Sequence, residues 1–235
     1  MIFLIDAGHG GLSIPRSGNK QKYMTPGKRF YHEEKNIHMY EGVLNRTIAN
    51  NVIEWCQKIG QDYRIIHDSV EDTTLKRRVR LANGQWKQNN NCIYVSIHCN
   101  AGGGTGYEMW HYPGSEKGKQ LAGAMIDGFE REFAPEELTN RGIKQNDTWS
   151  VLKRTKMPSV LVECAFMDTW HPDSELLIYQ TTRFSDAVIM GLATFYLGNS
   201  GDISPDKKKK FQHGTSKLDH LLMAEKNKQE ENHEL

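Results

Sequence analysis

The chain has 235 residues, of which 37% are hydrophobic and 25% charged, and its formal net charge at pH 7 is +1. This composition is typical of a water-soluble globular protein, and the length allows one large core followed by a tail. The balanced charge, without a basic stripe, argues against nucleic-acid binding, and no apolar segment approaches the roughly 20 residues of a membrane span.

An apolar run opens the chain and ends in a glycine-rich turn. Residues 1–5 lead into Asp6, Gly8 and His9, which predicts a buried strand that delivers Asp6 and His9 to its carboxyl end. Open α/β sheets bind ligands at that edge, and the glycines leave room for a metal or substrate, although an ordinary loop histidine is the alternative. Because this strand begins at residue 1, we expect no signal peptide and synthesis in the cytoplasm.

A polar stretch separates this strand from the first helix. Residues 12–40 show no clear period, which predicts a long loop with His32 and His38 in solvent. Residues 41–59 have helical spacing, with Glu41 on the inward side. Buried carboxylates are usually paired or bound to metal, and the alternative is a first-turn acid that the helix dipole favours.

A second strand repeats the form of the first. Residues 92–99 are mostly apolar, carry His98 near the end and precede a glycine-rich turn, so neighbouring strands would bring His98 and His9 together. Glu163 ends another apolar strand, over 159–166, where sheet stability alone would not select an acid. The remaining expected elements are a strand over 63–67, a helix capped by Thr73 or Thr74 with Leu75, Val79, Ala82 and Trp86 on its core face, a strand over 106–112, a helix from Ser115 and a last helix ending near Gly198.

The composition changes after residue 198. Residues 200–235 contain as many lysines as acidic residues and few apolar ones. We therefore expect one catalytic domain over residues 1–198 and a polar tail over 199–235 that is partly disordered or forms one short helix.

Four residues in this pattern point to metal chemistry. Two imidazoles, His9 and His98, with one carboxylate, Glu41, and an open fourth position are what a catalytic zinc needs. Zinc lowers the pKa of bound water to about 7 and polarises a carbonyl. Glu163 could take the water's proton and pass it to a leaving nitrogen, which describes amide hydrolysis. Asp6 or a backbone carbonyl would orient an imidazole, and other divalent metals also suit these ligands.

Several ordered segments resemble the zinc-dependent N-acetylmuramoyl-L-alanine amidases of the amidase-3 type. The resemblance covers residues 1 to about 197. Its segments are DAGHGG (6–11), Glu41 with Asn45, SIHCNA (96–101), GYE (106–108), RGIK (141–144) and MPSVLVE (157–163). The resemblance implies a single-domain α/β fold with a twisted, mostly parallel sheet of about six strands and helices on both faces. It also implies one Zn²⁺ per chain held by His9, Glu41 and His98, with Glu163 as the catalytic acid/base.

The reaction implied by the resemblance is hydrolysis of the amide between N-acetylmuramic acid and L-alanine in peptidoglycan. Arg141, Lys144 and Asn100 would contact the substrate. Some cell-division members of this family insert an inhibitory helix after the strand that corresponds to 106–112. The short connection at 111–119 therefore predicts an enzyme that needs no activator protein, and we expect a monomer.

We expect neither a leader nor a wall-binding repeat, and this expectation leads to a predicted biological setting. We expect a phage-type endolysin that is made in the cytoplasm and acts in the cell wall or periplasm after release, with a virion-borne or secreted effector as alternatives. Two other functions remain open: a zinc peptidase or carboxypeptidase acting on stem peptides, and a non-catalytic wall-binding or virion protein with an amidase fold.

Overall fold

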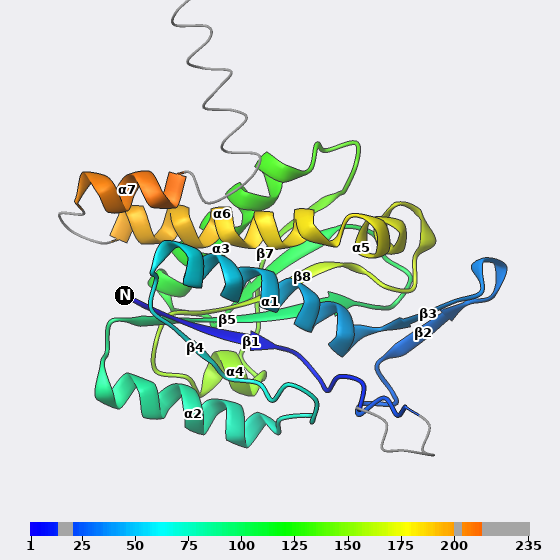
Figure 1. Cartoon of the computed structure of the whole chain (residues 1–235), viewed down its shortest axis with the longest axis horizontal. Helices are drawn as coiled ribbons and strands as arrows, with labels where there is room; N and C mark the ends of the chain where they lie inside the picture. The colour runs from blue at the N-terminus through cyan, green and yellow to red at the C-terminus, as the bar shows by residue number, and fades with distance from the viewer. Residues whose placement is uncertain (14–20, 200–203, 213–235) are drawn as a thin grey trace, which may run out of the picture.

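A six-stranded, mostly parallel sheet lies between two layers of helices (Figure 1). The computed structural model describes residues 1–13, 21–199 and 204–212. The strand order is β4-β1-β5-β8-β6-β7, and β6 pairs antiparallel with β8 while the other pairs of neighbours are parallel. The strands are β1 (Ile2–Ala7), β4 (Tyr63–Ile65), β5 (Cys92–Asn100), β6 (Tyr107–His111), β7 (Asn140–Gln145) and β8 (Ser159–Phe166). The predicted α/β fold class is confirmed.

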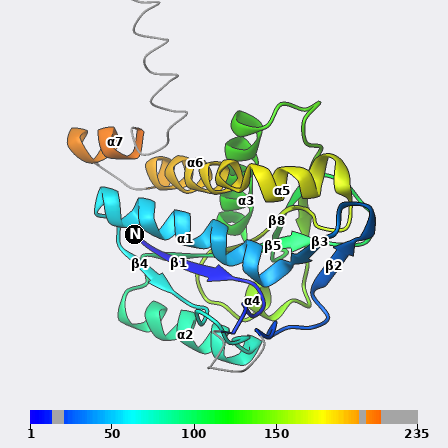
Figure 2. The same ribbon diagram turned by 45° about the vertical axis from the view of Figure 1, so that its right-hand side comes forward.

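Helices cover both faces of the sheet (Figures 1 and 2). One layer contains α1 (Glu41–Ile59), α3 (Glu116–Glu132) and α6 (Thr181–Asn199), and the other contains α2 (Leu75–Gln88) and α4 (Ser150–Lys153). Phe3 and Ile5 of β1 belong to the first core, whereas Ile2 and Leu4 belong to the second. Burial on both faces explains why this strand reads as an uninterrupted apolar run. Among the described residues, every helix is too short or too polar to cross a bilayer.

The stretch predicted as a loop contains a β-hairpin, so this prediction was wrong. Strands β2 (Arg29–His32) and β3 (Ile37–Tyr40) pair antiparallel around a 3₁₀ turn, η1 (Glu33–Lys35), and the hairpin projects from the sheet's carboxyl edge (Figure 1). His32, predicted to be in solvent, is buried, and its Nε2 lies 3.0 Å from both the Met167 carbonyl and Ser174 Oγ. Strands of four residues are too short to show a period, which is why the sequence concealed them.

Helix α2 confirms part of its predicted core face, because Ala82 is buried and Trp86 packs against the core. Thr74, one of the two predicted caps, caps this helix: its side chain accepts a hydrogen bond from the Arg77 backbone N–H. Leu75, however, is 56% exposed, and the buried side chains of the helix are Arg78 and Ala82. Arg78 reaches inward to Asp6 of β1, an ion pair that apolar periodicity cannot reveal.

Short elements complete the described part of the chain. Residues 112–115 join β6 to α3, so the chain has no inserted helix at this point. A helical turn (Trp170–Ser174) and α5 (Glu175–Tyr179) follow β8, and α7 (Pro205–Gln212) follows α6. The rest of the expected tail, from residue 213, lies outside the described residues.

Helix α7 packs on the domain that was expected to end before it. Phe211 is 1% exposed, stacks on Tyr196 with ring centroids 4.4 Å apart, and meets Trp55 edge-on at 5.4 Å. Phe211 thus belongs to the same core as Tyr196 and Trp55, and the boundary at residue 198 stays a prediction.

We expect Phe211→Ala to lower the free energy of unfolding by about 2 kcal/mol. A fully enclosed phenylalanine costs about 3–5 kcal/mol on truncation, but α7 can detach without global unfolding, which limits the loss. Urea denaturation measures the change, and Lys209→Ala on the exposed face of the same helix is the control. A loss below about 0.5 kcal/mol, the usual size for surface sites, would contradict docking of α7.

Candidate metal centre and active site

The sheet brings four predicted residues to one place. Strands β1, β5 and β8 are neighbours. His9 follows β1 and His98 lies near the carboxyl end of β5, whereas Glu163, predicted to end its strand, lies within β8, three residues before its end. His98 pairs with Glu163 in the register of β5 and β8, and Glu41 begins α1 beside them. The rings of His9 and His98 lie 5.1 Å apart at 90°, as expected for histidines delivered by neighbouring strands.

Glu41 joins the two imidazoles. Its Oε1 lies 3.2 Å from His9 Nε2 and 3.0 Å from His98 Nδ1, and one ligand atom from each of the three residues lies within 4.8 Å of the others. Two imidazole nitrogens and one carboxylate oxygen form a donor set that suits zinc. The residues present therefore fit the metal that the sequence suggested.

The charge state of Glu41 suits a metal ligand. Burial acts to raise the pKa of this carboxyl, but hydrogen bonds and charge interactions with His9 and His98 outweigh burial and hold the pKa well below its usual range. Glu41 is therefore an anion at neutral pH, the form that binds metal ions.

Tight backbone packing positions both histidines. His9 has a φ of 62°, in the left-handed region, and the Gly8 carbonyl accepts from Asn45 Nδ2 at 3.1 Å. A Cβ added to Gly8 would lie 2.2 Å from Cε1 of His98, far inside van der Waals contact. Glycine at position 8 therefore makes room for the imidazole of His98.

Asp6 acts differently from the expectation that it orients an imidazole. Its carboxylate accepts hydrogen bonds from Tyr94, Ser96 and Arg78. Arg78 in turn donates to the Ala7 carbonyl at 2.8 Å and to the His9 carbonyl at 3.4 Å. Asp6 therefore supports the backbone of the turn through Arg78, a residue that the sequence analysis did not nominate.

Glu163 lies in an unusual electrostatic environment. Its Oε2 is shielded from solvent and has no hydrogen-bond partner among the described residues. Burial raises the pKa of this carboxyl well above its ordinary value, the negative charges of Glu41 and Glu108 raise it further, and Lys28 opposes them. A buried carboxyl with a raised pKa beside a cavity is a candidate for proton transfer.

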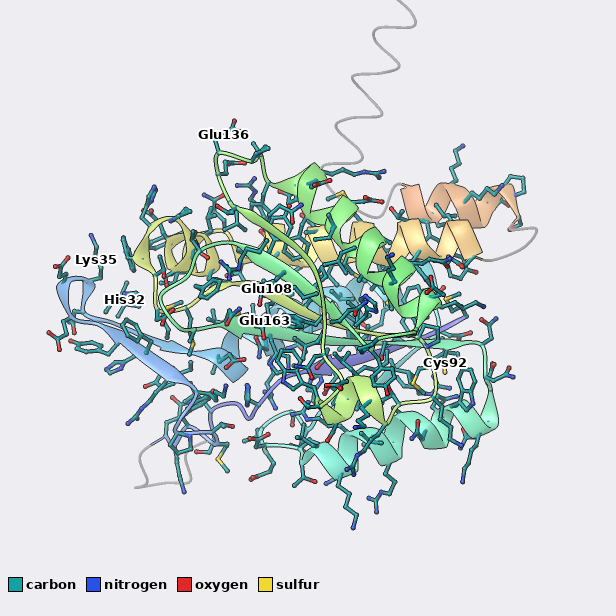
Figure 3. All side chains as sticks on the ribbon, turned by 180° about the vertical axis from the view of Figure 1, so that it is seen from behind. His32, Lys35, Cys92, Glu108, Glu136 and Glu163 are labelled. Atoms are coloured by element: carbon teal, nitrogen blue, oxygen red, sulfur yellow. The ribbon has the colours of Figure 1, made fainter. Side chains whose placement is uncertain are left out.

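Glu108 is the centre of a polar network beside Glu163, its partner in the register of β6 and β8 (Figure 3). Its Oε2 accepts from Arg141 Nε at 2.7 Å and from Lys144, and its Oε1 accepts from Asn100 at 3.1 Å and from Trp110 at 3.0 Å. Burial acts to raise the pKa of Glu108, but these donors lower it overall. In the sequence, Glu108 is distinguished only as the last residue of the GYE segment.

A cavity of about 640 Å³ contains the candidate site. His9, Glu41, His98 and Glu163 line it, together with Asn100. Its other lining residues include Lys28 from the hairpin base and an apolar wall formed by Leu75, Trp149, Val151 and Leu161. Arg141 instead lines a separate cavity of about 450 Å³. Of the three predicted substrate contacts, Asn100 thus reaches the main cavity, whereas Arg141 and Lys144 are paired with Glu108.

Comparison with known proteins is consistent with this arrangement. The family model for N-acetylmuramoyl-L-alanine amidase matches residues 3–194. The chain is 28% identical over 194 residues to the sporulation-specific N-acetylmuramoyl-L-alanine amidase of Bacillus subtilis (strain 168), which covers 80% of this chain and 64% of that protein. It is 27% identical over 224 residues to an endolysin of Bacillus phage SPP1, which covers 91% of this chain and 73% of that protein. The chain thus spans less than two thirds of the length of the B. subtilis relative.

A solved structure shares the fold. An N-acetylmuramoyl-L-alanine amidase from Clostridium difficile 630 superposes with a TM-score of 0.63 at 26% sequence identity, over 85% of this chain and 98% of that chain.

Proposed function

The chain belongs to the N-acetylmuramoyl-L-alanine amidase family, and on that basis we propose that it hydrolyses the amide bond between N-acetylmuramic acid and L-alanine in peptidoglycan. The observation that carries this proposal is the convergence of His9, Glu41 and His98 with Glu163 in one cavity. Three metal-binding donors beside a carboxyl with a raised pKa form the equipment that amide hydrolysis requires.

The cofactor in this proposal is one Zn²⁺ per chain, held by His9, Glu41 and His98. When bound, it would polarise the scissile carbonyl and lower the pKa of a water molecule. Glu163 takes the proton of the attacking water and delivers it to the leaving nitrogen, so that the products are a carboxylic acid and a free amine. The nearby cation would favour the ionised form of Glu163, so the shift that burial causes is partly offset when the site is loaded.

The shape of the cavity suits the two sides of the scissile bond. The wall that contains Leu75 and Trp149 offers contacts to the methyl groups of the lactyl and alanyl units. Asn100 Nδ2 donates to Glu108 at 3.1 Å, which leaves the second amide hydrogen for the substrate. Arg141 and Lys144 hold Glu108 in place by donating to its carboxylate. In this proposal they contact stem-peptide carboxylates only when the substrate is long enough to reach them.

We further propose a phage-type lytic role, supported by the similarity to the endolysin of phage SPP1 over 91% of this chain. In this role a monomer, released to the cell wall, acts without an activator protein. Detection of the protein packaged in virions, or exported intact from healthy cells, would contradict the lytic assignment without affecting the reaction.

Mass analysis of the products from intact peptidoglycan tests the reaction. We expect free stem peptides that begin at L-alanine, together with glycan strands whose lactyl groups carry no peptide. Shortened stems still attached to sugar would identify a peptidase. Intact peptidoglycan, with zinc bound to the protein, would identify a wall-binding protein.

The metal assignment has its own expected result. Calorimetric titration of chelator-treated protein should show one zinc ion per chain, and zinc at a hundred times its Kd should stabilise the fold by about 2.7 kcal/mol. Glu41→Gln replaces the one anionic donor by a neutral amide oxygen, so the zinc affinity should fall by about a hundredfold, the upper end of the range for outer-shell changes. Glu34→Gln on the exposed hairpin turn is the matched control. Equal affinity in both variants would contradict the ligand set.

A further inference from the structure

Lys28 is a charged residue of the cavity that the ligand set and the proton-transfer role leave unused. Its Nζ lies 3.8 Å from Oε2 of Glu41, and half of its side chain is exposed. Its charge also acts on Glu163, in the direction that favours the carboxylate. One ammonium group therefore interacts with both functional carboxylates of the site.

Hydrogen bonds tie the backbone of Lys28 to the segments that carry two of the candidate metal ligands. Its carbonyl accepts from the Glu41 backbone N–H at 3.0 Å, and its own N–H donates to the Thr25 carbonyl at 2.9 Å. Thr25 Oγ1 in turn accepts from the Gly10 N–H at 2.7 Å, next to His9. The hairpin base is thus tied to the helix that begins with one ligand and to the turn that presents another. These bonds hold the lysine at the cavity while its long side chain can still turn.

The ammonium group is available for another partner. Oε1 of Glu41 faces the two imidazoles, whereas Oε2 faces Lys28. At 3.8 Å this contact is longer than the roughly 2.7–2.9 Å of a charge-assisted hydrogen bond, so the pair is weak. Among the described residues that line the cavity, the other lysine or arginine is Arg78, which is buried and committed to Asp6 and to backbone carbonyls.

We propose that Lys28 is a further catalytic residue, whose ammonium group stabilises the negative charge that develops on the carbonyl oxygen of the scissile amide. This inference rests on the proposed function. The water oxygen adds to the carbonyl carbon, the C–N bond breaks, and Glu163 carries the proton from water to nitrogen. Lys28 neither gives up nor takes a proton in this sequence. It supplies a positive charge beside the reacting carbonyl, in a cavity where water is partly excluded and such charges act strongly.

Lys28→Met tests the role because it keeps the length of the side chain and removes the charge. With a soluble muramyl peptide we expect kcat to fall about 10- to 100-fold, less than the 10²–10³ for a fully enclosed oxyanion donor because Lys28 is half exposed. KM should stay within about twofold, since the charge develops only in the transition state. Lys28→Arg should retain part of the rate. Lys35→Met is the matched control, because Lys35 lies at the far end of the same hairpin (Figure 3). Its ammonium group lies over the Trp170 ring.

Chemical rescue separates loss of the positive charge from misfolding of a variant, because the charge is restored to a protein that is already folded. Lys28→Cys followed by alkylation with 2-bromoethylamine restores an ammonium group at this position. The four native cysteines are buried, so alkylation is directed to residue 28, and wild-type protein treated in parallel shows any other effect. We expect kcat to rise several-fold on alkylation of the variant.

Zinc affinity, measured by calorimetry, provides a readout besides activity. Removing a positive charge near the ligands should leave the affinity unchanged or increase it. An unchanged kcat in Lys28→Met would overturn the inference, as would a rise in KM alone, which would indicate binding of a substrate carboxylate. Weaker zinc binding would also overturn it, because Lys28 would then act through Glu41. If zinc-loaded wild-type protein releases no stem peptides, the proposed function itself fails and the inference fails with it.

Discussion

Glu163→Gln should lower kcat by about 10²–10⁴-fold, the usual contribution of a positioned general acid–base. The amide that replaces the carboxyl has nearly the same shape but cannot accept and return a proton at the reacting atoms. KM and zinc affinity should change little, because the three metal donors come from His9, Glu41 and His98. Product release from peptidoglycan and calorimetric zinc titration measure the two effects separately.

A second glutamate, far from the cavity, provides the control for Glu163→Gln. Glu54→Gln, on the exposed face of α1, changes the same functional group away from the cavity and should retain full activity. More than a tenth of the wild-type kcat in Glu163→Gln would assign proton transfer to another group. Loss of zinc binding together with activity would instead make Glu163 part of the metal site.

The same variant has an expected effect on stability, measured without metal. Burial and two neighbouring carboxylates raise the pKa of Glu163 in the folded protein, so folding is penalised as pH rises above the unfolded value of about 4.3. Glu163→Gln cannot ionise and escapes this penalty. Its stability relative to wild type should therefore increase from acidic to neutral pH. A difference that is independent of pH would show that Glu163 has an ordinary pKa in the metal-free protein.

The parts of the fold that could be predicted are those where one periodicity dominates. Strands β1, β5 and β8 are buried on both faces, so their apolar runs were visible. His9 and His98 were located by the glycine-rich turns after two of these runs, and Glu163 by being an acid within the third. Glu41 was visible because a carboxylate on the apolar side of a helix is costly unless it has a partner. Each of these signals lies within a single element.

The residues that the sequence concealed depend on contacts between elements. The pairing of β2 with β3 and the burial of His32 against the Met167 carbonyl join short segments without a period of their own. Arg78 lies between two exposed arginines on α2, at positions 77 and 80, yet it is 3% exposed. Its partner Asp6 lies 72 residues away in the chain, and only the parallel sheet brings them together.

Arg78→Met should lower the free energy of unfolding by about 3–5 kcal/mol, the cost of leaving one member of a buried ion pair without its partner. Asp6 is fully buried. Tyr94 and Ser96 would still donate to it, but among the described residues no cation would remain hydrogen-bonded to it, because Arg46 interacts with it only through its charge and donates to backbone carbonyls. The variant also loses the hydrogen bonds from Arg78 to the carbonyls of Ala7 and His9. Urea denaturation at neutral pH should show a lower midpoint with an unchanged slope.

A matched pair of variants separates the charge effect from packing. Arg77→Met, one position earlier on the exposed face of α2, should change stability by less than about 0.5 kcal/mol, as surface substitutions do. Adding Asp6→Asn to Arg78→Met removes the uncompensated charge, so the double variant should be more stable than Arg78→Met alone, a coupling that only interacting residues show. Zinc affinity should remain low in both, because the His9 turn has lost its support from Arg78. Recovery of zinc affinity in the double variant would mean that the charge of Asp6, rather than the hydrogen bonds of Arg78, determines the position of His9.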